Sequence, residues 1–215
     1  MLLKEAVEFG KISSNNTKMP DTTYPVDAFA CKVGSKLRKI EGSVCSACYT
    51  IRLQKLRPCV DKGYKKNLFK WQKWHTLGIE GIKMWIEAIA FQILRAKAKD
   101  HRWFDGGDLQ SLDMLLAIEE VAKQTPEVRH WLPTKEYGIY NKYLKENIEP
   151  DNLVIRVSAP MIDGKPNKAF RNTSTVYKNS EPIGFECKAR TRGNACGSCR
   201  ACWSKEIKNV SYSKH

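Results

Sequence analysis

The 215-residue chain lacks the patterns that identify several common protein classes. No basic segment followed by an apolar core opens it, and the longest apolar stretch, residues 84–94, carries Glu87 and Gln92 and is too short to span a bilayer. There is no Gly-x4-Gly-Lys-Ser/Thr phosphate loop and no Gly-x-Ser-x-Gly nucleophile elbow, and the four histidines have no paired ligand spacing. These absences argue against common nucleotide hydrolases, esterases and histidine-rich metal sites. They predict a cytoplasmic protein with no membrane partner.

Basic residues and cysteines are abundant by contrast. Lys and Arg number 37 against 23 Asp and Glu, which gives a formal charge of +14, and there are eight cysteines. Thiols stay reduced in the cytoplasm, so eight cysteines there predict metal ligands or catalytic thiols before disulfides.

The 127 residues between the two groups of cysteines alternate helical and strand patterns. Strands are expected near 102–104, 128–132 and 152–158, with helices over 80–99, from a Ser111 cap to Thr125, and over 136–147. This alternation predicts an α/β fold with parallel strands, built as a partial or complete (β/α) barrel-like core. We expect residues 1–180 to form this core and residues 181–215 to form a cysteine-rich metal-binding segment packed on it. Functional loops should follow the carboxyl ends of the strands, at 105–108, 134–136 and 158–163.

The last cysteines form the strongest motif of the chain, with two-residue spacers that let consecutive thiolates face one centre. They are Cys187, Cys196, Cys199 and Cys202. Such spacing suits tetrahedral zinc or an iron–sulfur cluster, although reduced cysteines without a metal are an alternative.

The first cysteines lie within 29 residues, at Cys31, Cys45, Cys48 and Cys59. Their density favours a metal site, but Cys-x2-Cys also occurs in redox dithiols. Cys59 could instead be a buried cysteine outside the ligand set, and the two groups could share one site.

A Gly-Asp turn, residues 105–108, ends the first predicted strand. Asp105 and Asp108 could act as bases, bind a metal or accept from ribose hydroxyls, and Gly106 and Gly107 would let a ligand approach the backbone. The alternative is a turn in which Asp and Gly serve only the backbone conformation.

Polar residues also follow the next two strands. Lys135 could contact phosphate or pair with Glu136. Arg156 lies inside an apolar strand with Ser158 near its end; a buried arginine would need an anionic partner, whereas an edge position would face water. We assign Lys135 a catalytic role and place Arg156 and Ser158 at the cofactor.

Lysines and aromatic residues are interleaved over residues 62–75, a pattern that suits phosphate contact and base stacking. The candidate nucleic-acid residues are Lys62, Lys65, Lys66, Lys70, Trp71, Lys73 and Trp74. The alternative is an amphipathic helix with inward tryptophans and solvated lysines.

The order of these motifs resembles a family of cysteine-rich proteins encoded by tailed phages, which would place the protein in the host cytoplasm. The matching pieces are Asn15-Asn16-Thr17-Lys18-Met19-Pro20, Cys31, Cys48-Tyr49, residues 101–108, residues 126–135, and the last four cysteines. That family in turn is similar to the radical S-adenosylmethionine enzymes, in which a Cys-x3-Cys-x2-Cys loop after the first barrel strand holds a [4Fe–4S] cluster. The resemblance implies a cluster on Cys31, Cys45 and Cys48, with Tyr49 as aromatic neighbour and residues 105–108 near the cofactor. Thirteen residues separate Cys31 from Cys45 here, where the superfamily has three.

These observations favour an iron–sulfur cluster over zinc and S-adenosylmethionine as a further cofactor. We expect a radical-enzyme-like metalloprotein that modifies nucleic acid or a nucleotide. The alternative is a zinc-stabilised nucleic-acid-binding protein without catalysis, in which the metal serves folding.

Overall fold

The computed structural model describes residues 1–14 and 17–214, and one mixed sheet organises this part of the chain. Asn15 and Asn16, part of the sequence motif above, lie outside the described residues. The eight strands follow the spatial order β1-β2-β3-β4-β5-β6-β8-β7. β1 pairs antiparallel with β2, and the other neighbours are parallel.

The strands are short apart from the central ones. They span Ser13–Ser14 (β1), Thr22–Tyr24 (β2), Asp100–Trp103 (β3), Arg129–Thr134 (β4), Leu153–Ile162 (β5), Thr173–Tyr177 (β6), Phe185–Glu186 (β7) and Asn209–Ser213 (β8). The helices span Leu3–Ala6 (α1), Lys32–Leu37 (α2), Tyr49–Leu56 (α3), Pro58–His75 (α4), Gly78–Arg95 (α5), Leu112–Gln124 (α6) and Tyr137–Tyr143 (α7). Three short 3₁₀ helices cover Ala28–Ala30 (η1), Ala189–Arg192 (η2) and Ala201–Trp203 (η3).

From β2 to β6 the parallel strands lie side by side in chain order. A doubly wound sheet would reverse its strand order at a switch point, and no such reversal occurs over these strands. The order is that of a singly wound sheet, as in (β/α) barrels, but β1 and β7 are free edges and the sheet stays open. The predicted α/β class is therefore confirmed, and the complete barrel that the prediction allowed is not formed.

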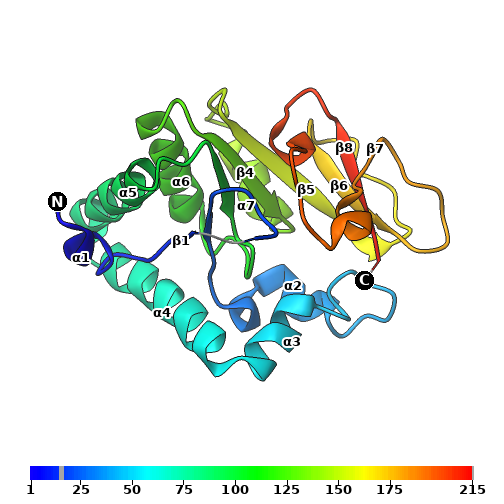
Figure 1. Cartoon of the computed structure of the whole chain (residues 1–215), viewed down its shortest axis with the longest axis horizontal. Coiled ribbons are helices and arrows are strands. Elements are labelled where there is room, and N and C mark those ends of the chain that lie inside the picture. Colours follow the sequence, from blue (N-terminus) through cyan, green and yellow to red (C-terminus); the bar gives the residue numbers. More distant parts are fainter. Residues whose placement is uncertain (15–16, 215) are drawn as a thin grey trace.

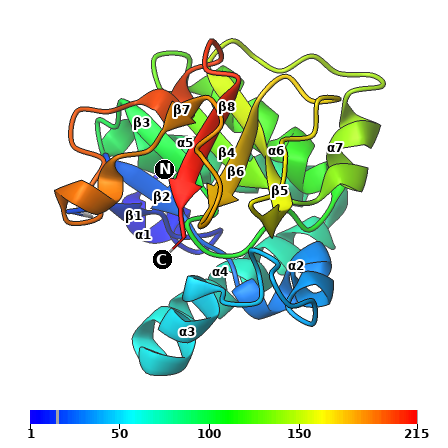
Figure 2. The same ribbon diagram turned by 90° about the vertical axis from the view of Figure 1, so that its right-hand side faces the viewer.

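One face of the sheet packs against the helices and carries the main core (Figures 1 and 2). Helix α5 buries Trp85, Ile89 and Ile93 because these side chains recur on one face of the helix. Helix α6 begins as predicted, since the Ser111 hydroxyl accepts a hydrogen bond from the Met114 amide at 3.1 Å. No helix in the described ranges is long and apolar enough to cross a membrane.

The other face of the sheet is covered by the C-terminal segment. A second, smaller core forms there from Trp131 of β4, Trp203 and Cys202 of η3, and Val210 of β8. Trp131 and Trp203 meet edge to face, with ring centroids 5.0 Å apart. Strands β7 and β8 also join the sheet, so residues 181–214 both extend the sheet and cover one of its faces.

Arg156 stabilises this arrangement from the middle of β5. Its side chain is fully buried at 0% exposure and donates five hydrogen bonds to backbone carbonyls, those of Thr173, Ala201, Cys202, Ser204 and Ile207. The sequence predicted either an anionic partner for a buried Arg156 or an edge position that faces water. Neither is observed, because the side chain is buried and backbone carbonyl dipoles stabilise its charge. Its donors are used within the fold, which gives it a structural role and removes it from the predicted cofactor contacts.

The carboxyl ends of the strands meet at one edge of the sheet, and helices α2 and α3 lie against this edge in both views (Figures 1 and 2). The chain reaches it directly after β2, through the connection that holds the first group of cysteines. The fold therefore brings these cysteines to the edge where parallel sheets carry their functional loops.

We predict that Arg156→Met lowers the free energy of unfolding by about 3–5 kcal/mol, because five buried carbonyls lose a charged donor. Urea unfolding followed by circular dichroism measures this. Arg171→Met is the matched control: Arg171 is exposed and reaches Glu206 only at 3.9 Å, so a change within about 0.5 kcal/mol is expected. Equal losses for the two variants would contradict the structural role of Arg156.

Candidate functional site

The loop that carries Cys31 is attached to the end of β4. Glu136, two residues beyond that strand, accepts a hydrogen bond from the Val33 amide at 2.9 Å through its carboxylate. The Lys32 ammonium donates to the Gln110 carbonyl at 2.6 Å, beyond the end of β3. These contacts fix the start of α2, and therefore Cys31, against two strand ends.

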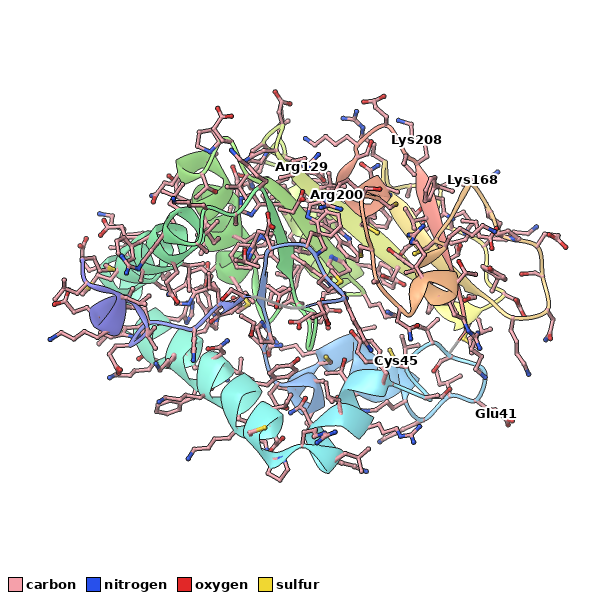
Figure 3. The ribbon with its side chains drawn as sticks, in the orientation of Figure 1. Glu41, Cys45, Arg129, Lys168, Arg200 and Lys208 are labelled. Atoms are coloured by element: carbon pink, nitrogen blue, oxygen red, sulfur yellow. The ribbon has the colours of Figure 1, made fainter. Side chains whose placement is uncertain are left out.

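The loop that carries Cys45 is attached to the end of β5. Ser43 forms an isolated antiparallel bridge with Met161, the Val44 amide donates to the Pro160 carbonyl at 2.9 Å, and the Ile162 amide donates to the Gly42 carbonyl at 2.9 Å. Tyr49, next to Cys48, donates its hydroxyl to the Asp105 carbonyl at 2.6 Å. Strand ends of β3, β4 and β5 thus hold the three successive cysteines, and Figure 3 shows Cys45 beside α2 and α3 below the strands.

Three of the first four thiols converge. The sulfurs of Cys45 and Cys31 lie 3.7 and 3.8 Å from the position that a Cβ atom would take at Gly34. Burial raises the pKa of the Cys31 thiol, and the charges of Asp108, Cys48 and Cys45 raise it further. Cys59 is exposed in the first turn of α4 and is not among the groups that act most strongly on Cys31. The convergent set is Cys31, Cys45 and Cys48.

Asp108 is buried beside these thiols and connects two strand ends. Its carboxylate accepts from the Thr134 hydroxyl at 2.7 Å, from the Lys135 amide at 2.9 Å and from the Leu109 amide at 2.8 Å. Desolvation raises its pKa to about 6 despite these donors. A carboxyl group with such a pKa can exchange a proton near neutral pH.

Asp105 lies on the other side of the same turn. It is largely buried, and desolvation raises its pKa although the Arg102 guanidinium opposes the shift. The Tyr64 hydroxyl reaches one carboxylate oxygen at 3.5 Å; the other oxygen has no hydrogen-bond partner among the described residues, and neither has the Arg102 Nε atom. Both of these atoms are buried, so Asp105 and Arg102 each hold an unpaired polar atom inside the described part of the protein.

The two glycines of the turn serve packing. A Cβ at Gly106 would lie 2.3 Å from the Tyr64 ring, and a Cβ at Gly107, whose φ is +84°, would lie 2.4 Å from the Val26 side chain. The predicted close approach at these positions is therefore made by Tyr64 and Val26, which corrects the assignment of Gly106 and Gly107 to a ligand.

Lys135 and Ser158 both lie at the carboxyl edge. Burial raises the pKa of Cys45 and the charge of Lys135 opposes it, so this ammonium lies close to the thiol. Ser158, on β5, accepts a hydrogen bond from Ser174 at 3.1 Å, and its carbonyl accepts from the Tyr137 hydroxyl at 2.6 Å. The catalytic role of Lys135 stays a prediction, whereas Ser158 is engaged within the sheet.

The last four cysteines gather on the opposite face of the sheet. Burial raises the pKa of Cys196, with the charge of Cys187 adding to it, and the pKa of Cys202 rises to about 12. Cys202 contacts the Tyr212 hydroxyl at 3.1 Å. The segment is held at the amino end of β3 by Asp100, whose carboxylate lies 2.5 Å from Arg200 and 2.8 Å from Arg129; these two arginines stand next to each other in Figure 3.

Among the residues that the structure describes, no three His, Cys, Asp or Glu side chains are placed to hold a single metal ion. The chemistry of the donor sets nevertheless fits a soft metal: several thiols lie close enough for their charges to repel, and a metal relieves this by binding them as thiolates. Thiolates around a multi-iron cluster lie farther apart than those around one ion. The metal assignments for all eight cysteines remain predictions.

Helix α4 does not present the predicted row of aromatic residues. Trp71 is 2% exposed and packs in the core, while Trp74 stacks on Phe9 at 4.2 Å. Lys70 is buried and its ammonium donates to the Val7 carbonyl. The amphipathic alternative is therefore correct for the two inward tryptophans, whereas Lys70, which it expected to be solvated, is buried. The remaining lysines of the set, Lys62, Lys65, Lys66 and Lys73, are exposed, and Lys65 pairs with Asp61 at 2.7 Å.

Sequence reasoning missed a group of cations beside the first thiols. Arg38, Arg52 and Lys55 line an open cavity of about 420 Å³ together with Cys45 and Cys48. The signal was present, since Cys48, Arg52 and Lys55 are spaced i, i+4, i+7 and so share one face of a helix.

Asp108 gives a testable pH dependence. Because burial raises its pKa in the folded protein, the folded state holds the proton more tightly than the unfolded chain, and stability falls as pH rises from about 4 through about 6. For metal-free protein we expect this group to remove about 2 kcal/mol from the free energy of unfolding between pH 4 and 7. Urea unfolding at both pH values should show a smaller fall for Asp108→Asn than for wild type. Asp151→Asn, at an exposed carboxylate, should keep the wild-type fall; an unchanged fall in Asp108→Asn would contradict the assignment.

Comparison with known proteins gives one family match. A family model described as Gene product 88 matches residues 10–205. No curated protein and no solved structure gives a significant match. The match covers β1 to β7, the first cysteines and the last cysteines, and it confirms the phage-type family expected from the order of motifs. The chain belongs to the Gene product 88 family.

Proposed function

We propose that this protein is an iron–sulfur protein, similar to the radical S-adenosylmethionine enzymes, that modifies nucleic acid or a nucleotide. One observation carries the proposal: Cys31, Cys45 and Cys48 converge at the carboxyl edge of a singly wound parallel sheet. Three thiols with a buried carboxylate beside them form a sulfur-rich, potentially anionic site, which suits iron–sulfur ligation.

The order of elements supports this proposal. In the enzymes that the sequence resembles, the cluster loop follows the first barrel strand. Here Cys31 follows β2, the first parallel strand, and the Gly-Asp turn follows β3, its neighbour. The thirteen intervening residues between Cys31 and Cys45 fold as α2 and a turn that is attached to β5, so the wider spacing still brings both sulfurs together.

The surrounding residues have roles that their positions suggest. A cluster bound by the three thiolates would supply one-electron chemistry. Asp108 lies near Cys31 and, with its raised pKa, would hold or release a proton at its carboxylate oxygen. Lys135 offsets thiolate charge at Cys45, and Tyr49 orients the Cys48 end of the loop through its bond to Asp105.

The alternative of a zinc site that serves folding is favoured only for the last four cysteines. Cys202 belongs to the second core, and Arg156 holds the carbonyls of Cys202 and its neighbours. A metal on Cys187, Cys196, Cys199 and Cys202 would therefore stabilise the segment that covers the sheet, whether it is zinc or a second cluster.

We predict that protein purified without oxygen is brown and contains iron and sulfide, because the first thiols ligate a cluster. Cys31→Ala, Cys45→Ala and Cys48→Ala should each remove most of the iron and sulfide bound at this site and its absorption near 400 nm. Iron, sulfide and zinc analysis with absorption spectra measures this, in a Cys196→Ala/Cys199→Ala background that empties the other group.

Cys59→Ala is the matched control, since Cys59 lies in the same region of the sequence but is exposed on α4. It should keep the iron and sulfide of its parent. A colourless protein that binds stoichiometric zinc alone would contradict the proposal, as would equal losses in Cys59→Ala and Cys31→Ala.

A further inference from the structure

We infer that the open cavity beside Cys45 and Cys48 binds the phosphate of a nucleotide. A nucleotide would then be the substrate class of the proposed function, and the catalytic role of the cavity rests on that function. Anion binding itself depends on separate residues and can be tested separately.

The cavity lies between the turn after α2 and one face of α3. Its volume is about 420 Å³, within the range of small-molecule sites. Arg38 enters from the end of α2, and Arg52 and Lys55 enter from successive turns of α3. The two thiols of Cys45 and Cys48 form part of the same wall, so a ligand in the cavity lies directly beside the proposed cluster.

The three cations keep their positive charge unpaired by acidic side chains. Among the described residues, no carboxylate lies within ion-pair distance of Arg38, Arg52 or Lys55. Arg38 is fixed in place, because its guanidinium donates to the Ala28 carbonyl at 3.1 Å and to the Ser35 hydroxyl at 2.7 Å. Three unpaired cations around one cavity favour an anion with several acceptor oxygens, as phosphate has.

The cysteines beside the cavity interact strongly with only some of the cations that line it. The cations that act most strongly on Cys45 are Lys135 and Arg38. Arg52 and Lys55 are exposed side chains on the α3 wall and are not among those strongest partners. Their ammonium and guanidinium groups therefore remain for a ligand.

Apolar side chains complete the cavity on the α3 side. Ile51 is half-buried there, and Leu56, at the end of α3, is 65% exposed. A large exposed leucine next to cationic side chains offers a surface for a flat apolar ring, so the wall combines phosphate contacts with ring contacts. A nucleotide has both parts. Because the cavity is open, the nucleotide could be free or could belong to a nucleic-acid strand.

The test is binding of two probes, adenosine monophosphate and a single strand of ten deoxythymidines, measured by calorimetry at low salt. We expect Arg52→Ala/Lys55→Ala to weaken binding at least about tenfold. It should also lower the salt dependence of strand binding by about one released counterion for each phosphate contact that is lost. Lys142→Ala/Lys145→Ala removes the same charge from exposed positions at the end of α7 and just beyond it, and should bind like wild type. Binding of both probes identifies a nucleotide site open to free ligand, and binding of the strand alone identifies a strand site.

Three results would overturn the inference. Wild-type protein that binds neither probe refutes it, whatever the iron analysis shows. Equal weakening in Arg52→Ala/Lys55→Ala and Lys142→Ala/Lys145→Ala would assign binding to the overall positive charge of the protein. Loss of iron and sulfide in Arg52→Ala/Lys55→Ala would show that these cations stabilise the cluster on the cysteines. Unchanged iron together with weakened probe binding supports a role of the cavity in ligand binding. The proposed cluster is judged by the cysteine variants alone, so the two failures can be told apart.

Discussion

The hydrogen bonds that begin at the buried Asp108 carboxylate determine where the first cysteines lie. Asp108 accepts from Thr134 and from the Lys135 amide, the Thr134 hydroxyl accepts from the Glu136 amide, and Glu136 accepts from Val33 at the start of α2. This continuous chain of contacts connects the ends of β3 and β4 to the loop after β2. Without it, the loop that carries Cys31 would lose one of its attachments to the strand ends.

The central strands and helices could be predicted from the sequence because they follow strong patterns. Strands near 102, 128 and 153 and the helices that join them are confirmed, with bounds shifted by a few residues. The outer strands were missed because they are short or polar. In β6 and β8, Thr175 and Ser211 hydrogen-bond each other at 2.8 Å inside the sheet, so these strands bury hydroxyl groups and show no apolar pattern.

The candidate site could be predicted only in part. The spacing of the cysteines is visible in the sequence, but their arrangement in space depends on contacts between distant segments. Cysteine spacing identifies the ligand candidates, but the convergence of Cys31 and Cys45 depends on contacts with β4 and β5, far along the chain. Arg156 and Trp71 were misassigned for the same reason. The apolar neighbours of Arg156 predicted an unusual role for it, and the lysines around Trp71 predicted an exposed surface. In both cases, contacts with residues distant in sequence determine the role.

The central claim is that Cys31, Cys45 and Cys48 together hold a multi-iron cluster at the carboxyl edge of the sheet. Electron paramagnetic resonance of the reduced Cys196→Ala/Cys199→Ala protein tests it most directly. We expect the signal of a reduced [4Fe–4S] cluster. The spectrum should change when S-adenosylmethionine is added, and the signal should be absent after Cys31→Ala. A protein that contains iron and sulfide but gives the same signal with Cys31 and Cys45 both replaced would contradict it.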